Sequence, residues 1–334
     1  MKVTDFAGYL SKYLTSYLPG QRNLSPHTIA SYRDTFRLLL TFCRDDKGIC
    51  PESLTLAHID DDLVREFMAW IESVRKCSIA TRNQRLAAIH AFFRYVQALA
   101  PEKILVYQRI LAIPLKRTGT PHISYLTQDA LESILRQPDR HTAAGRRDLV
   151  LLAVLYDSGA RVSELTELLV RDVRLAQPAT ITLKGKGRKV RHVPLMGRTA
   201  SLLSDYMKER RLELDFPLFF NSRRQKLTRA GVSYIIGKYV KVANKHGALL
   251  PNKVSPHVLR HTKAMHLLQA NVNLVYIRDF LGHVSVTTSE IYARADNRMK
   301  RLALEKAYSL PTSDNLPHWQ DDSDLLSWLQ GLCR

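Results

Sequence analysis

The sequence has few of the residues that form metal sites and disulfides in regular patterns. Its 334 residues include four cysteines, and no two of these stand in a Cys-x-x-Cys pair. Neither a zinc ribbon nor a disulfide framework is therefore indicated. The acidic residues are scattered as well, whereas a Mg²⁺ site needs several carboxylates close together. We expect a protein without a metal or other cofactor.

Long apolar runs are missing too. No stretch approaches the roughly 18 to 20 consecutive apolar residues of a membrane-spanning helix. The first residues, MKVTDFAGYLSKYL, lack the basic-then-apolar layout of a secretory signal. We expect a cytoplasmic protein that has no membrane partner.

Negative charge is scarce relative to positive charge. Lysine and arginine number 50 against 31 aspartates and glutamates, which gives a net charge of +19 and an isoelectric point near 9.9. A surplus of this size usually reflects a polyanionic partner. The basic residues are spread along the chain rather than concentrated in one amphipathic helix, which favours a DNA duplex over a membrane. A protein that is merely basic is the alternative.

Residues 1–105 show helical periodicity only. Apolar spacing predicts helices over 28–44, 60–74 and 78–99, with Ser25 as the N-cap and Pro26 as the first residue of the first helix. The third helix carries a polar face that either contacts phosphates and base edges or is simply solvated. Its candidate DNA contacts are Thr81, Arg82, Asn83 and Arg85.

Residues 106–122 contain two prolines and a glycine and are predicted as a linker, in which Lys116 and Arg117 could follow a DNA backbone. Beyond it, Thr127 resembles an N-cap and Gly159 closes a buried helix. Two short strands, 179–184 and 188–194, flank a Gly-Lys-Gly turn. We predict a mainly α fold with a small antiparallel sheet: a helical domain over 1–105, a mixed α/β domain over 123–310, and an acidic tail over 311–334.

The segment SPHVLRHTKAMHLL, residues 255–268, contains a histidine pair spaced for zinc, His257 and His261. Arg260 lies between them, and arginine cannot bind a metal. With Ser255 as the N-cap, His257 falls in the first helical turn, where free N–H groups and the helix dipole favour an anion. A phosphate site is therefore the better interpretation, although a His-x-x-Arg pattern alone is weak. We assign His266 a structural role.

Other segments supply residues that suit the same anion. Arg161 follows a glycine turn, with Glu164 three residues on. Lys186 occupies the tip of the predicted hairpin, and His283 and Tyr292 follow a predicted helix end. Each has an ordinary explanation, such as a structural ion pair, an exposed turn lysine or a buried tyrosine. Together they suit phosphoryl chemistry without a metal, in which fixed cations stabilise the transition state and a tyrosine hydroxyl is the nucleophile.

Four segments in this order resemble the tyrosine recombinases, the phage integrase family: GARVSEL, LKGKGRKVRHVPL, HVLRHT and LGHVSVTTSEIYAR. The resemblance covers roughly residues 20–310 and implies a SAM-like helical core-binding domain followed by a catalytic domain. It implies a site-specific recombinase of the integrase or transposase type. The alternatives are a chromosome or plasmid dimer resolvase of Xer type and a non-catalytic DNA-binding relative.

The resemblance also implies roles for single residues. Tyr292 would attack the scissile phosphate, giving a 3′-phosphotyrosine and a free 5′-hydroxyl without metal or ATP. Arg161 and Arg260 would clamp the non-bridging oxygens, and Lys186 would protonate the leaving 5′-oxygen. The remaining members are His257, which would assist proton transfer from the tyrosine, His283, which would hydrogen-bond the phosphate, and Glu164, which would orient the site.

His261 matches a common family position and is assigned support rather than catalysis. Further DNA contacts are expected from Lys184 and Arg188, beside the hairpin tip. The partners implied are a double-stranded recombination site and other recombinase protomers. These would be a homo-oligomer, dimeric on each site and tetrameric in the synapse, or a paralogous recombinase. The protein would then work on the nucleoid.

Overall fold

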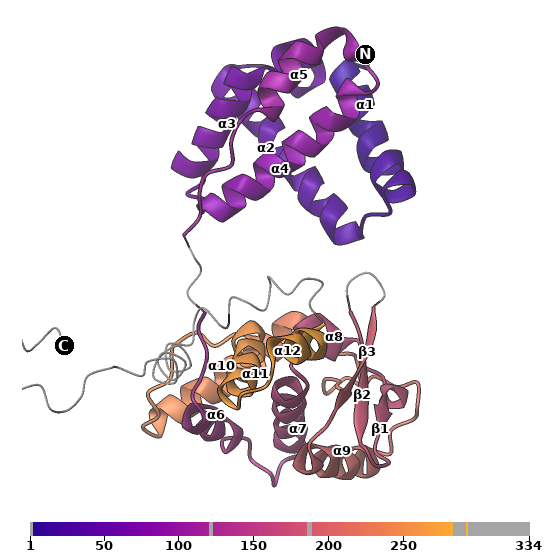
Figure 1. Cartoon of the computed structure of the whole chain (residues 1–334), viewed down its shortest axis with the longest axis vertical. Coiled ribbons are helices and arrows are strands. Elements are labelled where there is room, and N and C mark those ends of the chain that lie inside the picture. Colours follow the sequence, from indigo (N-terminus) through magenta and orange to yellow (C-terminus); the bar gives the residue numbers. More distant parts are fainter. Residues whose placement is uncertain (1–2, 120–122, 186–188, 283–291, 293–334) are drawn as a thin grey trace, which may run out of the picture. The chain divides into compact units, whose positions relative to one another are not determined.

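The chain folds into two compact units, residues 1–121 and 122–334. The structure is a computed structural model that describes residues 3–119, 123–185, 189–282 and 292. Figure 1 labels the α-helices and strands of both units, and each unit is described by itself. No helix in these residues is long and apolar enough to cross a membrane.

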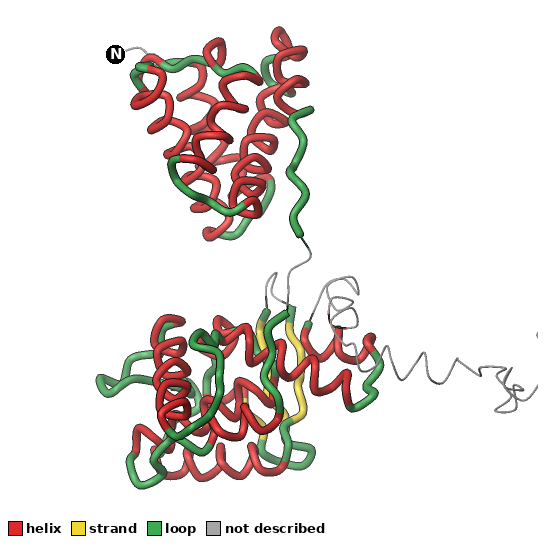
Figure 2. The backbone as a smooth tube through the Cα atoms, turned by 90° about the vertical axis from the view of Figure 1, so that its left-hand side faces the viewer, coloured by secondary structure: helices red, strands yellow, loops and turns green. Residues whose placement is uncertain are grey.

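The regular elements in the described residues of unit 1 are all helices, red in Figure 2, joined by loops in green. Its helices are α1 (Asp5–Lys12), η1 (Tyr13–Gln21), α2 (Pro26–Lys47), α3 (Asp61–Ser73), α4 (Ile79–Gln97) and α5 (Ile104–Leu111), with single turns η2 (Pro51–Ser53), η3 (Leu56–His58) and η4 (Pro101–Lys103). The predicted start of α2 is confirmed, because Ser25 accepts a hydrogen bond from the Thr28 amide and Pro26 is the first helical residue.

Aromatic rings fill the core of unit 1. Phe6, Phe36 and Phe92 are each at most 2% exposed, and their rings meet at angles of 56° to 78°. Such tilted and edge-on contacts stabilise aromatic pairs beyond the area that they bury. Helix α5 packs against α3 and α4 and closes this core through Tyr107 and Ile110. It therefore belongs to the domain, although its residues partly overlap the predicted linker.

Unit 2 is built around α7 (Ala143–Ser158), most of whose side chains are buried. Helix α7 packs against α6 (Gln128–Leu135), α9 (Gly197–Arg210) and α11 (Pro256–Gln269). The other helices in the described residues of this unit are α8 (Val162–Thr166), η5 (Val170–Asp172), α10 (Arg229–Lys245) and α12 (Leu274–Leu281). The predicted cap at Thr127 and the helix end at Gly159 are confirmed, the latter with a φ of 56°.

A three-stranded antiparallel sheet lies beside these helices, shown in yellow in Figure 2. Its order is β1 (Val173–Arg174), β2 (Thr180–Lys184) and β3 (Val190–Pro194), and Leu183 pairs with Arg191 across β2 and β3. The predicted mainly α fold with a small antiparallel sheet is confirmed. Strand β1 was not predicted because two residues are too few to show the alternation by which a strand is recognised in sequence.

Candidate active site

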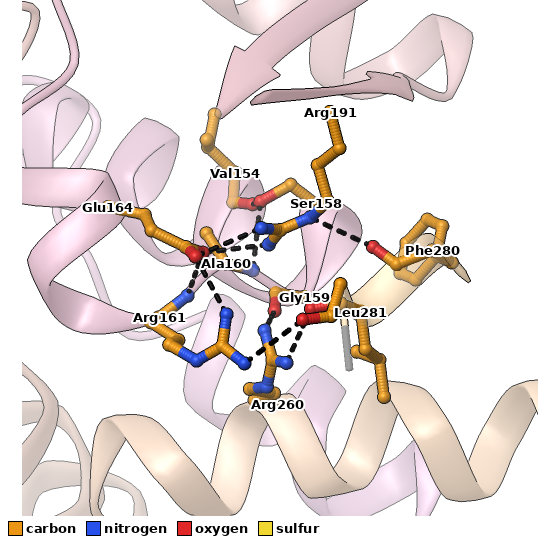
Figure 3. Close-up of polar contacts among 11 residues, drawn as sticks. Val154, Ser158, Gly159, Ala160, Arg161, Glu164, Arg191, Arg260, Phe280 and Leu281 are labelled. Carbon is orange, nitrogen blue, oxygen red and sulfur yellow. Dashed lines mark hydrogen bonds and ion pairs between the residues drawn. The ribbon is translucent and has the colours of Figure 1, made fainter. Parts of the chain in front are cut away.

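Arg260 lies at the centre of the site and is only 3% exposed. It stands in the second turn of α11, which begins after the N-cap Ser255 as the sequence predicts. Its Nη1 donates to the carbonyl oxygen of Gly159 and its Nη2 to that of Leu281, both at 2.6 Å (Figure 3). These carbonyls mark the C-terminal ends of α7 and α12, where the helix dipole favours a cation.

The Arg260 guanidinium stays charged despite its burial. Burial and, to a smaller extent, the charge of Arg161 lower its pKa while Glu164 raises it, and the net result is a pKa of about 10. At pH 7 the group is therefore still protonated. A cation held in a desolvated position by fixed carbonyls is well suited to stabilise negative charge that develops nearby.

Glu164 is the carboxylate that positions two further arginines (Figure 3). Its side chain is 2% exposed. Arg161 donates to it twice, from the backbone amide and from Nη1, both at 2.8 Å. Arg191, reaching in from β3, donates to both carboxylate oxygens at 2.9 and 2.7 Å. Burial alone would raise the pKa of Glu164, but the hydrogen bonds from Arg191 and Arg161 outweigh it and lower the pKa.

Arg191 also contacts the end of α12. Its Nε donates to the Phe280 carbonyl oxygen at 3.1 Å. Gly282 adopts a left-handed φ of 66°, and a Cβ there would lie 3.0 Å from the Arg191 guanidinium. Glycine is therefore required twice at this position, for its backbone conformation and for the close approach of the arginine. Arg161 adds a longer hydrogen bond to the Gly282 carbonyl oxygen at 3.4 Å.

Tyr292 is buried, 1% exposed, in a small core that it shares with Met265, Leu281 and other apolar residues of α11 and α12. Its hydroxyl lies 2.9 Å from Nδ1 of His261. The exposed ring of His257 stacks on His261 with a centroid distance of 6.0 Å. His261, which the sequence analysis gave only a supporting role, thus contacts both His257 and the tyrosine.

The protonation states of this pair follow from its surroundings. Burial lowers the pKa of His261, and the neighbouring His257 and Arg260 lower it further, so the imidazole is neutral at pH 7. Burial raises the pKa of Tyr292, whereas the charges of Arg260 and Arg161 act in the opposite direction. The phenol is therefore protonated, and it donates its hydrogen to Nδ1 of His261 when the neutral imidazole carries its proton on Nε2.

The structure brings together five of the residues predicted for the site, namely Arg161, Glu164, His257, Arg260 and Tyr292. Lys186, Arg188 and His283 lie outside the described residues. Lys184, predicted to contact DNA, forms an ion pair with Asp172 at 3.1 Å and is 55% exposed at its side chain. Among the residues that the structure describes, no group of three or more His, Cys, Asp or Glu side chains is placed to hold a metal ion.

In unit 1, several predicted DNA contacts join α4 to the segment that follows α5. Arg82 is 6% exposed, donates to the Pro114 carbonyl oxygen at 3.2 Å and pairs with Glu72 at 3.3 Å. Asn83 forms a reciprocal pair with the backbone of Lys116, whose ammonium also reaches Glu72 at 2.6 Å. These hydrogen bonds and ion pairs hold residues 114–116 on α4.

Three other predicted DNA contacts remain in unit 1. Arg85 donates to the Ser31 carbonyl oxygen at 2.8 Å and thereby ties α4 to α2. Thr81 shares a hydrogen bond with the N-cap Ser78, and Arg117 is exposed. DNA binding by these side chains stays a prediction.

Sequence reasoning missed Arg191 altogether. One signal was available, because residues two apart in a strand share a face, and Arg191 is two residues before the apolar Val193. An arginine on the inward face of a strand needs a buried acceptor, here Glu164. The contact of His261 with Tyr292 gave no such signal, since 31 residues separate the two in sequence.

Comparison with known proteins agrees with this geometry. Residues 124–299 match the phage integrase family, and residues 11–98 match the N-terminal SAM-like domain of phage integrases. The chain belongs to the phage integrase family and is a tyrosine-type site-specific recombinase. It is 39% identical to y4rC of Sinorhizobium fredii, a candidate integrase/recombinase, over 99% of both chains. It is 34% identical to the tyrosine recombinase XerC of Pelobacter propionicus, over 83% of this chain and 87% of that one.

Solved structures show the same architecture. The XerH site-specific recombinase bound to a palindromic difH substrate after cleavage matches with a TM-score of 0.68 and 25% identity, over 89% of this chain and 85% of that one. The Tn1549 transposon integrase in complex with transposon right end DNA matches with the same TM-score at 18% identity, over 89% and 98%. The second likeness concerns the fold alone.

Proposed function

We propose that this chain cuts and rejoins DNA strands at specific sites, with Tyr292 as the nucleophile. The hydroxyl oxygen attacks the scissile phosphorus, which yields a 3′-phosphotyrosine and a free 5′-hydroxyl. The observation that carries the proposal is the meeting of one buried tyrosine with the charges of Arg161 and Arg260. A tyrosine hydroxyl is a weak nucleophile near pH 7, and nearby cations favour its ionised form.

The arginines supply the electrostatic part of the reaction. Arg161 is anchored by Glu164 and keeps 31% of its side chain exposed, so it can reach the non-bridging phosphate oxygens. Arg260 is held from behind by two carbonyl oxygens. Preorganised donors of this kind need no rearrangement when negative charge develops on the phosphorane. They replace what a metal ion would otherwise contribute.

The remaining catalytic assignments follow from the family resemblance. Lys186 protonates the departing 5′-oxygen, His283 hydrogen-bonds the phosphate, and His257 assists proton transfer at the tyrosine through its contact with His261. The phosphotyrosine conserves the energy of the phosphodiester bond. The 5′-hydroxyl of another strand can therefore attack it and reseal the DNA without ATP.

The partner that we propose is double-stranded DNA bound by several protomers on the nucleoid. The net charge of +19 suits a protein that surrounds a duplex. The XerH and Tn1549 recombinases, similar in fold, were solved on their DNA sites, and a related structure is a lambda integrase dimer on a core site. We propose a dimer on each site and a tetramer in the synapse.

A covalent-capture experiment tests the chemistry. The full chain selects binding sequences from duplexes with a random core, and the selected sites are rebuilt with a nick near the cut position. The expected product in EDTA, without ATP, is a protein–DNA adduct that survives SDS. Tyr292→Phe should bind the same duplexes and give none. An adduct in that variant, or one that requires Mg²⁺, would contradict the proposal.

For the biological role, we favour integration or transposition of a mobile element, with Xer-type dimer resolution as the alternative. The match to y4rC spans 99% of the chain at 39% identity, whereas matches to XerC proteins span 83% of it at 34% identity and 93% at 29% identity. Recombination of two selected sites on one plasmid and on two plasmids separates these roles. Integration predicts efficient joining between molecules. Products confined to excision within one molecule would favour the resolvase.

A further inference from the structure

His261 is placed to do more than support α11. Its Nδ1 lies 2.9 Å from the hydroxyl of Tyr292, within the range at which a general base takes a proton. The family pattern assigns proton transfer from the tyrosine to His257. That side chain is exposed, and its ring stacks on the ring of His261. Tyr292 is 1% exposed, so water has little access to the phenol, and Nδ1 of His261 is already within hydrogen-bond distance of its hydroxyl.

We propose that His261 is the catalytic base that accepts the phenolic proton of Tyr292. This inference rests on the proposed function, because it concerns the same phosphotyrosine reaction. The Tyr292 oxygen forms its bond to phosphorus as the O–H bond breaks, and the proton passes to Nδ1 of His261. The bond from phosphorus to the 5′-oxygen breaks, and that oxygen takes a proton from the general acid, which we assign to Lys186.

The reverse reaction uses the same atoms. When a 5′-hydroxyl attacks the phosphotyrosine, its proton leaves to Lys186, and protonated His261 returns a proton to the departing phenolate. One histidine thereby serves both cleavage and resealing. The groups that face it in the described residues are His257 and Arg260 on α11 and the phenol itself.

The decisive experiment compares two leaving groups. A suicide substrate with a 5′-bridging sulfur needs no general acid, because a thiolate leaves readily, but it still needs a base at the nucleophile. His261→Gln, which keeps a polar side chain yet cannot take the proton, should slow adduct formation about 100- to 10,000-fold on oxygen and sulfur substrates alike. Lys186→Ala should form the adduct slowly on the oxygen substrate and regain the lost rate on the sulfur substrate.

A matched control lies on the same helix. His266 holds Tyr156 in the same kind of pair, with Nδ1 2.9 Å from the hydroxyl, and belongs to the core. His266→Gln should cleave at the wild-type rate. His261→Ala gives a second test, and the binding affinity of each variant for the uncleaved duplex, with its melting curve, confirms that it is folded.

The pH profile adds a readout that a structural role would not move. The wild-type cleavage rate should fall as the pH drops below the ordinary range of histidine, and this dependence should be lost in His261→Gln. The proposal is overturned if His261→Gln cleaves like His266→Gln, if sulfur restores its rate, or if His261→Ala cleaves faster than wild type. Absence of an adduct with the wild-type chain would instead overturn the proposed function.

Discussion

Helix α11 carries two tyrosine–histidine pairs with the same hydrogen-bond length and different surroundings. His261 meets Tyr292 and His266 meets Tyr156, each with 2.9 Å between Nδ1 and the hydroxyl oxygen. In the second pair, Nε2 of His266 donates to the Leu126 carbonyl oxygen at 3.0 Å, which fixes the tautomer. That histidine joins the start of unit 2 to α7 and serves as a structural link.

The charges that shift the pKa values of the two tyrosines differ in sign, although the ammonium of Lys263 also lies 5.0 Å from the centre of the Tyr156 ring. Burial raises the pKa of both phenols, but the neighbouring carboxylate of Asp157 raises that of Tyr156 further. Arg260 and Arg161 instead lower that of Tyr292. We therefore expect the same pair of side chains to be inert beside a carboxylate and to support nucleophilic chemistry beside two guanidinium groups. The lesson is that a hydrogen bond alone does not define a catalytic pair.

Removing each hydroxyl in turn gives the largest contrast. Tyr292→Phe should abolish the covalent DNA adduct, because no oxygen remains to attack phosphorus. Tyr156→Phe should retain adduct formation and lose about 1 kcal/mol of stability, the usual contribution of one hydrogen bond. SDS gels of the suicide-substrate reaction and thermal melts measure the two effects. An adduct lost from both variants would show that the pairs are not distinct.

Weakening the positive charge near Tyr292 should have the next largest effect on stability and on the cleavage rate. Arg191→Met leaves the buried Glu164 carboxylate with Arg161 as its remaining arginine in the described site. Breaking a buried ion pair by removing one partner costs about 3 to 5 kcal/mol. Urea unfolding should show this loss, and cleavage by the folded fraction should slow because Glu164 then offsets more of the field at Tyr292. Arg278→Met, which removes a surface ion pair, is the control.

Substitution in the His266–Tyr156 pair should change the stability of the protein and leave cleavage unchanged. His266→Gln cannot satisfy both the Tyr156 hydroxyl and the Leu126 carbonyl in the same geometry, and a buried polar group left without a partner costs about 1 to 3 kcal/mol. For a unit of this size, each kcal/mol lowers the melting temperature by roughly 2 to 4 °C. Calorimetry measures the shift. A loss of cleavage with unchanged melting would reverse the roles assigned to the two histidines.

The smallest predicted effect concerns acid stability. The pKa of Glu164 lies below its ordinary value of 4.5 in the folded protein. Its stabilising contribution is therefore present above that value and is lost as the pH falls through the lower folded-state pKa. The free energy of unfolding of Glu164→Gln should therefore fall less steeply than that of the wild type as the pH drops below 4.5. Circular dichroism at a series of pH values measures this dependence. Parallel acid curves would contradict the assigned shift.

Local signals in the sequence were sufficient for much of the fold. The caps at Ser25, Thr127 and Ser255 and the helix end at Gly159 are confirmed because they depend on neighbours within a few residues. The β2–β3 pairing is also confirmed, since only a few residues separate the two strands in sequence. The two-residue strand β1 escaped prediction because its pairing depends on a partner strand.

The sequence by itself determined the helical region and the mixed region, the positive charge, and the ordered set of arginines, histidines and tyrosine that predicts a phosphate site. Only the tertiary structure decided how these residues meet. It buried Arg82, placed Arg191 on Glu164 and set His261 rather than His257 against Tyr292. The reason is physical: helical spacing defines which residues share a face, but which face meets a residue dozens of positions away depends on the packing of the whole unit.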